Sequence, residues 1–242
     1  MDDLVTVIQA RMTSNRLPGK VLAQIGDWVA LSLMLARLRR STMIGRIVIA
    51  IPDNEDNVSL RNFLRGLVDV DVVTGSEYNV LSRFVSVKKR FPAAFYVRLT
   101  ADCPFICPEV LDDVVAMALR SNGCASNVDP PTFADGFDVE CVSGNALDWL
   151  DVNSMSVVAR EHVTLALRGP NSPFVFGNVC NIRGDHSAIR LTLDTPKDLD
   201  ALNRISLFLG REGSVCASAG ELEAAYTHLR LIEVNGNLRR VR

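Results

Sequence analysis

A cluster of basic and small polar side chains follows the first apolar segment of the chain. Arg11, Arg16 and Lys20 lie within ten residues of one another, and Ser14 stands between them. A guanidinium group can donate two parallel hydrogen bonds to phosphate oxygens, and a lysine ammonium adds a movable positive charge. The segment is therefore predicted to bind a polyphosphate, with a solvated basic loop as the alternative. It is not a P-loop, because the GxxxxGK[ST] spacing is absent.

Two aspartates could hold a metal ion beside this loop. Asp102 follows the apolar segment Phe95–Leu99, and Asp194 lies in the segment LTLDTPKDL. Mg²⁺ is usually bound by one or two carboxylates together with substrate phosphates, so a bound triphosphate would call for such acids. Each aspartate also has a structural alternative. Asp102 could cap the turn that follows it, and Asp194 could stabilise the start of the next helix.

A further set of polar residues lies in the second half of the chain. Asp138 and Glu140 alternate in the segment DGFDVE, so they share one face if that segment is extended. They could bind sugar hydroxyls or simply face water. Arg160 and His162 stand near the start of a predicted helix. A lone histidine is more often structural than catalytic, so its role stays open.

Strands and helices alternate in the first half of the chain. Short apolar runs bounded by turn residues predict strands, and apolar residues at helical spacing predict helices. The predicted order is strand Leu4–Ile8, helix Trp28–Arg40, strand Arg46–Pro52, helix Asn54–Leu67, strand Val70–Thr74, helix Asn79–Phe91, strand Ala94–Leu99 and helix Glu109–Arg120. This alternation predicts an α/β fold: a three-layer α/β/α, doubly wound and mainly parallel (mixed) sheet. Such sheets bind ligands at the carboxyl ends of their strands, where the basic loop is expected.

The second half departs from this alternation. We expect an extended segment at Phe137–Ser143, helices at Asn145–Leu150 and Ala159–Leu167, strands at Phe174–Cys180 and Ala188–Leu193, and helices at Pro196–Leu209 and Ala219–Ile232. No flexible linker separates the two halves. Residues 1–242 are therefore predicted to form a single domain, with 126–183 as an elaboration.

Composition excludes several classes of protein. A net charge of −2 gives no general basic excess, which argues against a nucleic-acid-binding protein. The N-terminus carries acidic residues, and no apolar run approaches the ~20 residues of a membrane span, so we expect a cytoplasmic protein. Of the six cysteines only Cys103 and Cys107 are close in sequence, and they lack zinc-ligand partners at the required spacing. We expect reduced cysteines.

Together these segments resemble the cytidylyltransferase family that contains the spore-coat polysaccharide biosynthesis proteins and is related to CMP-KDO synthetases and acylneuraminate cytidylyltransferases. The residues responsible are IQARMTSNRLPGKVL at Ile8–Leu22, TGSEYNVLSRF at Thr74–Phe84, VRLTADCPFICPEVLD at Val97–Asp112, DGFDVE at Asp135–Glu140, REHVT at Arg160–Thr164 and LTLDTPKDL at Leu191–Leu199. They occur in the family's order and extend to about Leu209.

The resemblance implies an activity on a fold of the nucleotide-diphospho-sugar transferase type. A sugar hydroxyl would attack the α-phosphate of CTP, giving a CMP-sugar and pyrophosphate, with Mg²⁺ as cofactor. The catalytic residues would be Arg11, Lys20, Asp102 and Asp194, with the two aspartates sharing the metal. The sugar would be of an acidic or nonulosonic type, used for surface polysaccharide or glycan synthesis.

The resemblance also implies binding roles and an assembly. The nucleotide-binding residues would be Ala10, Arg11, Ser14, Arg16, Lys20, Gly75, Ser76, Thr100 and Ala101. Asp138, Glu140, Arg160 and His162 would bind the sugar. A homodimer is expected through the region Phe137–Cys180, so the elaboration at 126–183 would serve both sugar binding and dimerisation.

Two other functions fit the same fold class. A glycosyltransferase that uses a nucleotide-sugar donor generally carries an Asp-x-Asp metal motif, whereas the segment TADCP offers a single acid. A non-catalytic nucleotide-binding protein would be expected to lack a cation of the basic loop or one of the two aspartates, and all of them are present.

Overall fold

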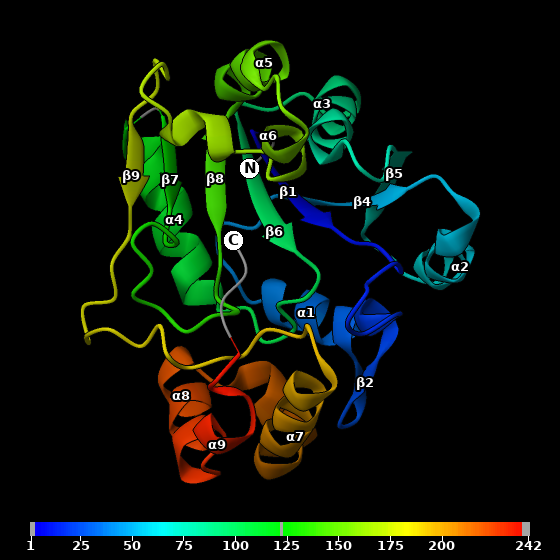
Figure 1. Ribbon diagram of the computed structural model, residues 1–242, viewed down its shortest axis with the longest axis vertical. Coiled ribbons are helices and arrows are strands. Elements are labelled where there is room, and N and C mark those ends of the chain that lie inside the picture. The colour runs from blue at the N-terminus through cyan, green and yellow to red at the C-terminus, as the bar shows by residue number, and fades with distance from the viewer. Residues whose placement is uncertain (1–2, 122, 239–242) are drawn as a thin grey trace.

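Four parallel strands form one half of the central sheet in the computed structural model, which describes residues 3–121 and 123–238. They are β1 (Leu4–Gln9), β4 (Arg46–Pro52), β5 (Asp71–Gly75) and β6 (Phe95–Thr100). Their order is β5-β4-β1-β6 (Figure 1). Because parallel strands end at the same edge of a sheet, the loop after β1 and the turn after β6 lie side by side.

Three further strands extend the sheet beyond β6. β8 (Glu140–Ser143) pairs antiparallel with β6, β7 (Cys124–Ser126) pairs antiparallel with β8, and β9 (Phe176–Asn178) pairs parallel with β7. The result is a seven-stranded mixed sheet in the order β5-β4-β1-β6-β8-β7-β9. The predicted α/β fold with a mainly parallel, mixed sheet is confirmed.

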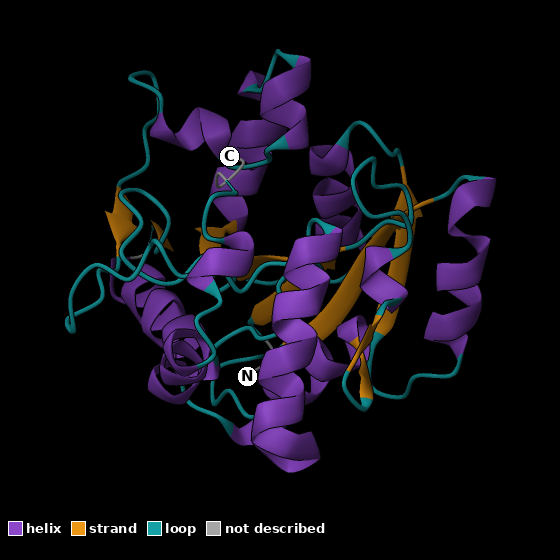
Figure 2. Cartoon of the chain, turned by 60° about the horizontal axis from the view of Figure 1, so that its bottom comes forward, coloured by secondary structure: helices purple, strands orange, loops and turns teal. Residues whose placement is uncertain are grey.

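Helices cover both faces of this sheet because side chains on successive strand residues point to opposite sides. In β1, Leu4 and Ile8 belong to one hydrophobic cluster, and Val5 and Val7 to another. The first cluster includes buried residues of α1 (Ala30–Leu38), α2 (Val58–Arg65) and α4 (Pro108–Ser121). The second includes residues of α3 (Val80–Arg90) and α5 (Gly144–Asn153). Figure 2 shows the strands lying among these helices.

The C-terminal helices form a separate group at one end of the molecule (Figure 1). They are α7 (Pro196–Cys216), α8 (Ala219–His228) and α9 (Ile232–Asn235). Their apolar side chains pack in a third cluster together with Leu191 and Leu193. None of the helices built from the described residues is both long enough and apolar enough to cross a bilayer.

Arg37 on α1 attaches this helical group to the rest of the fold. Its guanidinium is fully buried and donates hydrogen bonds to carbonyl oxygens of Ile106 (2.7 Å), Ser214 (2.9 Å) and Ala217 (2.8 Å). Burial lowers the pKa of the Arg37 side chain to about 10, so it stays charged at neutral pH. The segment after β6 and the C-terminal end of α7 are therefore bound to the same side chain.

One predicted helix begins two residues late, and one predicted strand was wrong. The helix expected from Trp28 begins at Ala30, because Trp28–Val29 forms strand β3, which pairs with β2 (Gln24–Ile25) in a short antiparallel hairpin. The strand expected at Ala188–Leu193 does not form. In that segment a single bridge joins Arg190 to Asp135, and Leu191 and Leu193 turn into the cluster of the C-terminal helices.

The helix expected at Ala159–Leu167 is also divided. It forms as α6 (Val157–Glu161) and a 3₁₀ turn (Leu165–Arg168), because Val163 between them has a positive φ of 53°. Other boundaries moved by a few residues. The ladder of the expected strand Phe137–Ser143 begins only at Glu140, and the helix expected to end at Leu209 continues through a kink at Gly210.

Replacing Arg37 tests its role as an anchor. Arg37→Met leaves three or more buried carbonyl oxygens without a donor, so it should lower the free energy of unfolding by about 3 kcal/mol. Urea unfolding measures this change. Arg39→Met is the matched control, because Arg39 is exposed and the side-chain hydrogen bond it makes within the described residues goes to the exposed carbonyl of Val68. Equal stabilities for the two variants would contradict the anchoring role.

Candidate functional site

The basic loop after β1 folds back on itself and fixes the position of Lys20. Gly19 has a positive φ of 72° that a residue with a side chain rarely adopts, and its N–H donates to the Met12 carbonyl at 2.9 Å. Lys20 begins a short 3₁₀ turn whose Val21 is buried. The backbone of Lys20 is thus held, while its four-carbon side chain extends away from the turn.

The ammonium of Lys20 lies between the two predicted metal ligands. Its Nζ is 2.8 Å from Asp102 Oδ2 and 2.6 Å from Asp194 Oδ1. The three residues come from the loop after β1, the turn after β6 and the segment before α7. The structure therefore brings Asp102 and Asp194 together, although 92 residues separate them in the chain.

Burial and charge act against each other in this group. Burial lowers the pKa of Lys20, but the carboxylates of Asp102 and Asp194 outweigh burial and raise the pKa above its usual value. Burial raises the pKa of Asp102, and the nearby ammonium of Lys20 reverses this and holds the pKa below its usual range. Lys20 and Asp102 are therefore both charged at neutral pH.

Backbone contacts hold the two aspartate segments side by side. The N–H of Leu193 donates to the carbonyl oxygen of Asp102 at 2.7 Å, and the hydroxyl of Thr192 donates to the same oxygen at 3.2 Å. The segment expected as a strand thus serves to align Asp194 with the turn after β6. Its hydrogen bonds go to this turn and to Asp135.

Arg190 and Asp198 support Asp194 from behind. Arg190 is buried and donates to Asp198 Oδ1 (2.8 Å), Asp135 Oδ2 (2.7 Å) and Asp194 Oδ2 (3.3 Å). Asp198 Oδ2 accepts the N–H groups of Asp194 (3.1 Å) and Thr195 (2.9 Å) in the capping box that starts α7. The helix start that offered a structural alternative for Asp194 is thus capped by Asp198, which leaves the Asp194 carboxylate to face cations.

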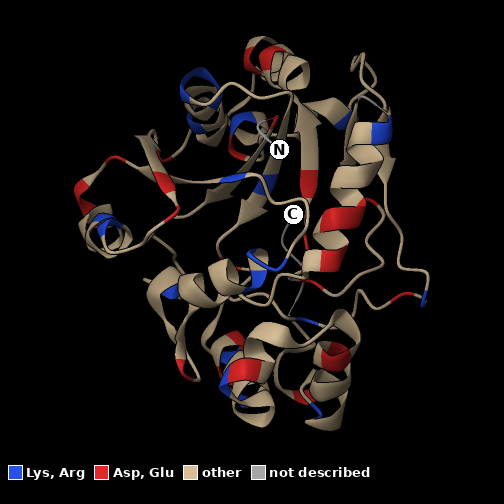
Figure 3. Cartoon of the chain, turned by 180° about the vertical axis from the view of Figure 1, so that it is seen from behind, with Lys and Arg blue, Asp and Glu red and all other residues tan. Residues whose placement is uncertain are grey.

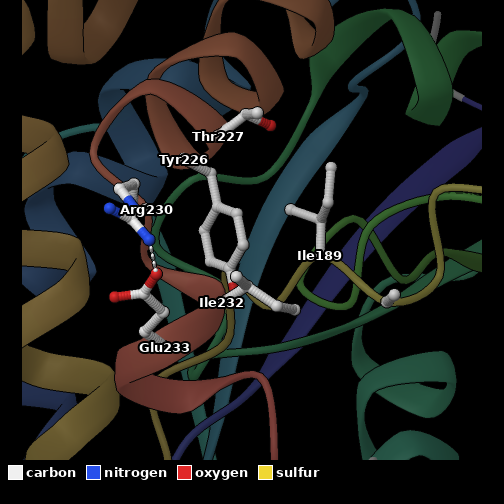
Figure 4. A pocket seen from close by; sticks show the side chains of 7 residues that line it. Ile189, Tyr226, Thr227, Arg230, Ile232 and Glu233 are labelled. Carbon is white, nitrogen blue, oxygen red and sulfur yellow. Dashed lines mark ion pairs between the residues drawn. The ribbon is translucent and has the colours of Figure 1, made fainter.

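A cavity of about 270 Å³ lies among the C-terminal helices, away from Lys20. Figure 4 shows its lining, which includes Ile189, Tyr226 and the ion pair between Arg230 and Glu233. The Tyr226 hydroxyl donates to Asn235, which in turn contacts Asp198. The cavity therefore borders the support of Asp194 and is not lined by Lys20, Asp102 or Asp194 themselves.

The remaining predicted nucleotide contacts lie along this same edge. Ala10 and Ala101 are tied to neighbouring strands, through hydrogen bonds from their N–H groups to Ala50 (3.1 Å) and Gln9 (3.0 Å). The other predicted positions are the ends of β5 and β6 or the basic loop: Gly75, Ser76, Thr100, Arg11, Ser14 and Arg16. Among them Arg16 contacts Asp194 at 3.2 Å. The structure thus gathers the predicted nucleotide residues at the carboxyl ends of three strands, β1, β5 and β6.

Two further residues lie at this edge and carried no predicted role. Arg83 on α3 is buried and donates to the Ala50 carbonyl at 3.0 Å, and its side chain lies against Gly75. Burial, and then the like charge of Arg11, lowers the pKa of Arg83 to about 10. Glu77 accepts hydrogen bonds from Thr13 and Asn54. In the sequence Arg83 is one arginine of a predicted helix and Glu77 one glutamate of a loop, and neither residue type alone indicates a site.

Glu140, a predicted sugar-binding residue, lies in a buried ion cluster. Its carboxylate accepts hydrogen bonds from Arg98, Arg168 (2.6 Å) and Thr164 (2.7 Å). Burial alone would raise the pKa of Glu140, but the charges of Arg98 and Arg168 lower it below its usual value. Arg98 also donates to Gln9 at 3.1 Å, which connects the cluster to the carboxyl end of β1.

The other predicted sugar-binding residues are placed apart from Glu140. Arg160 contacts Asp151 (2.8 Å) and Asn79 (3.0 Å), and His162 ends α6. Asp138 lies just before β8, near enough to Cys103 to help raise the pKa of that buried thiol. Asp138 is thus on the side of the Asp102 turn, whereas Arg160 is on the side of α3. In Figure 3 basic and acidic positions are mixed along the visible elements.

Comparison with known proteins identifies the family. The family described as cytidylyltransferase matches residues 5–227. The chain belongs to the cytidylyltransferase family. The resemblance expected from the motifs is thereby confirmed.

Relatives of this cytidylyltransferase-family protein include two of similar length. Spore coat polysaccharide biosynthesis protein SpsF of Bacillus subtilis is 32% identical over 230 residues, covering 90% of this chain and 92% of its own. An uncharacterised protein of Methanocaldococcus jannaschii is 34% identical and covers 81% of this chain and 79% of its own. A 3-deoxy-manno-octulosonate cytidylyltransferase of Rhizobium etli is 32% identical over 113 residues, which are 46% of this chain and 44% of its own.

Solved structures agree with the family and the fold. A cytidylyltransferase from Leptospira borgpetersenii superposes with a TM-score of 0.88 at 28% identity and covers 99% of both chains. A CMP:2-keto-3-deoxy-manno-octonic acid synthetase solved with CTP has a TM-score of 0.61 at 17% identity, covering 85% of this chain and 98% of its own. This second likeness shows the fold alone. The fold type expected for nucleotide-diphospho-sugar transferases is confirmed.

The donor set around Lys20 fits a divalent cation that arrives with phosphate. Asp102 and Asp194 offer two hard carboxylates close to a common point, which is the usual protein share of a magnesium site. Within residues 3–121 and 123–238 no three His, Cys, Asp or Glu side chains gather as a metal site. Phosphate oxygens and water would have to complete the coordination.

The Glu140 cluster makes a pH-dependent contribution to stability. Because the pKa of Glu140 lies below its usual 4.5 in the folded protein, its ion pairs stabilise the fold above that pH and are lost as the pH falls through the folded-state value. Glu140→Gln should lower the free energy of unfolding by about 3 kcal/mol at pH 7, since two arginines lose their counterion.

Urea unfolding at pH 7 and near pH 4 measures the effect. The difference between wild type and Glu140→Gln should shrink at the lower pH. Glu233→Gln is the control, because Glu233 pairs with Arg230 at the exposed surface and should matter little. A difference between wild type and Glu140→Gln that is the same at both pH values would show that the carboxylate charge is not what stabilises the cluster.

Proposed function

We propose that this protein is a nucleotidyltransferase that activates a sugar with CTP, giving a CMP-sugar and pyrophosphate with Mg²⁺ as cofactor. One observation carries the proposal. In a chain of the cytidylyltransferase family, Lys20 of the basic loop lies between Asp102 and Asp194 at the carboxyl ends of the parallel strands. Ligands of open α/β sheets bind at this edge.

The residues present suit displacement at the α-phosphate. Arg11, Arg16 and Lys20 would hold the triphosphate and neutralise charge on the leaving pyrophosphate. Asp102 and Asp194 would hold Mg²⁺, which when bound supplies charge neutralisation at the reacting phosphate. The fixed backbone of the loop would orient the phosphates for in-line attack by the sugar hydroxyl.

The rest of the nucleotide would lie along the strand ends. Gly75 and Ser76 after β5, and Thr100 and Ala101 after β6, would flank the base and ribose, with Ala10 beneath them. Ser14 of the basic loop would complete the phosphate contacts. Arg83 adds a buried positive charge near Arg11. The charge of Glu77 acts on it, but in the described residues no carboxylate forms an ion pair with it. A bound nucleotide would supply the missing negative charge.

An acidic sugar, of the nonulosonic type, would suit the charges near β8. Arg98 and Arg168 share the single buried carboxylate of Glu140. Asp129 is 3.6 Å from Arg168 but largely exposed, so its charge is screened. The cluster thus holds an excess positive charge that a sugar carboxylate could neutralise. Asp138, Glu140, Arg160 and His162 remain the proposed sugar-binding set, with Asp138 nearest the metal ligands.

A homodimer would use the surface of the elaboration at 126–183. Six large apolar residues described there are more than half exposed: Val152, Met155, Val157, Val158, Val175 and Ile182. Such a patch is typical of an interaction surface. We place the reaction in the cytoplasm, in the synthesis of surface polysaccharide or glycan, and the family relation to SpsF supports this use.

Asp102→Asn tests the proposed metal site. The amide keeps the shape of the side chain but removes one of two anionic ligands, so turnover should fall by at least about a thousandfold. Pyrophosphate release from CTP, measured with a panel of nonulosonic and other acidic sugars, gives the rate. The melting temperature checks that the fold is intact. Wild-type turnover in Asp102→Asn would rule out the assignment.

Arg168→Gln tests the proposed sugar class. Loss of this charge should raise KM for an acidic sugar by about tenfold, because a charge-assisted hydrogen bond is lost, while KM for CTP stays unchanged. Arg46→Gln removes an arginine from an exposed pair with Asp71 and serves as the control. If KM for CTP rose instead, Arg168 would belong to the nucleotide site.

A further inference from the structure

The position between Asp102 and Asp194, where a divalent cation would bind, is held by a positive charge of the chain itself. Lys20 Nζ makes hydrogen bonds to both carboxylates, at 2.8 and 2.6 Å, and only 12% of its side chain is exposed. Carboxylate oxygens close enough to share one ammonium are also close enough to share one metal ion. Lys20 and a divalent cation therefore compete for the same oxygens.

The charges around Asp194 make the competition unfavourable for a metal that arrives alone. Asp194 contacts Arg16 (3.2 Å) and Arg190 (3.3 Å) in addition to Lys20. Its negative charge is thus already compensated. A cation that enters this group has to break two ion pairs of Lys20 and meets the repulsion of three positive side chains.

Lys20 can leave the carboxylates without a change of fold. Gly19 and the turn Lys20–Leu22 fix its backbone through their own hydrogen bonds. The lysine side chain has four rotatable bonds, so its ammonium can move by several ångströms while the backbone stays in place. A displaced ammonium remains next to the basic loop, where the phosphates would bind.

We propose that Lys20 is a built-in counterion that occupies the metal position of the free protein and moves from Asp102 and Asp194 to the phosphates when metal and nucleotide bind together. The inference rests on the proposed function for the identity of the phosphate ligand. Its consequence is cooperativity: nucleotide strengthens metal binding, and by linkage metal strengthens nucleotide binding to the same extent. The lysine thus selects the metal–nucleotide complex over the free ion.

The test measures metal binding directly, without turnover. Mn²⁺ replaces Mg²⁺ as the probe, and electron paramagnetic resonance counts the bound ion. Lys20→Met removes the charge and keeps an unbranched side chain. In the absence of nucleotide this variant should bind Mn²⁺ at least about tenfold more tightly than wild type, because two close carboxylates lose their counterion. Addition of CTP should strengthen Mn²⁺ binding strongly in wild type and weakly in the variant.

Three controls separate the causes. Lys88→Met removes the same charge from a distant pair with Asp148 and should leave Mn²⁺ binding unchanged. Lys20→Arg keeps the positive charge and should not increase the affinity for Mn²⁺ without nucleotide, so it tests the idea even if Lys20→Met folds poorly. Asp102→Asn combined with Lys20→Met should lose the added Mn²⁺ binding, which locates the ion.

Two results would overturn the proposal. One is an Mn²⁺ affinity of Lys20→Met no higher than that of wild type in the absence of nucleotide. The other is a wild-type protein that binds Mn²⁺ equally well with and without CTP. Pyrophosphate release from CTP is measured separately. Its absence with every sugar would count against the proposed function, while the nucleotide-free Mn²⁺ measurements would still decide the role of Lys20.

Discussion

The bridge from Lys20 to Asp102 and Asp194 is the interaction on which the rest of the arrangement depends. It joins Lys20 to two segments that lie 82 and 174 residues further along the chain. Two partly buried carboxylates facing each other would be costly without a cation between them. The parallel half of the sheet places the first two segments at one edge, but the third has to come from the far end of the chain. The fold is therefore organised to bring Asp194 back to the strand ends.

The C-terminal helices make that return possible. Asp198 caps α7 and accepts the Asp194 N–H, and Arg190 connects both aspartates to Asp135. Asn235 on α9 contacts Asp198 and the Arg190 carbonyl. Each polar group in this support has a partner, as buried polar groups require. The helices beyond the sheet thus contribute to the site by fixing one carboxylate, even though none of their own side chains faces Lys20 directly.

The sequence allowed the parallel strands to be predicted closely because they are buried on both faces and read as unbroken apolar runs, as at Arg46–Pro52. The segment Ala188–Leu193 has the same apolar pattern, but its backbone forms hydrogen bonds with Asp135 and Asp102 and joins no strand of the sheet. These partners are distant in the chain, so the local pattern could not indicate them. The pairing of Lys20 with two aspartates likewise could not be predicted from the local sequence pattern. The motifs named all three residues, whereas Arg190 and Arg83 had been given no role and proved to be buried.

Charge balance gives a reason for the arginines that lie buried or half-buried near one edge, namely Arg83, Arg98 and Arg168. If both substrates are anions, they must approach each other at the edge where Asp102 and Asp194 already carry negative charge. Arg83 has no carboxylate bonded to it within the described residues, although the charge of Glu77 acts on it, and Arg98 and Arg168 share one glutamate. Each cluster is costly when the protein is empty, because a buried charge without full compensation is destabilising. Each cost would be relieved by an anionic ligand, so the free protein stores on either side of Lys20 part of the electrostatic free energy that binding would release.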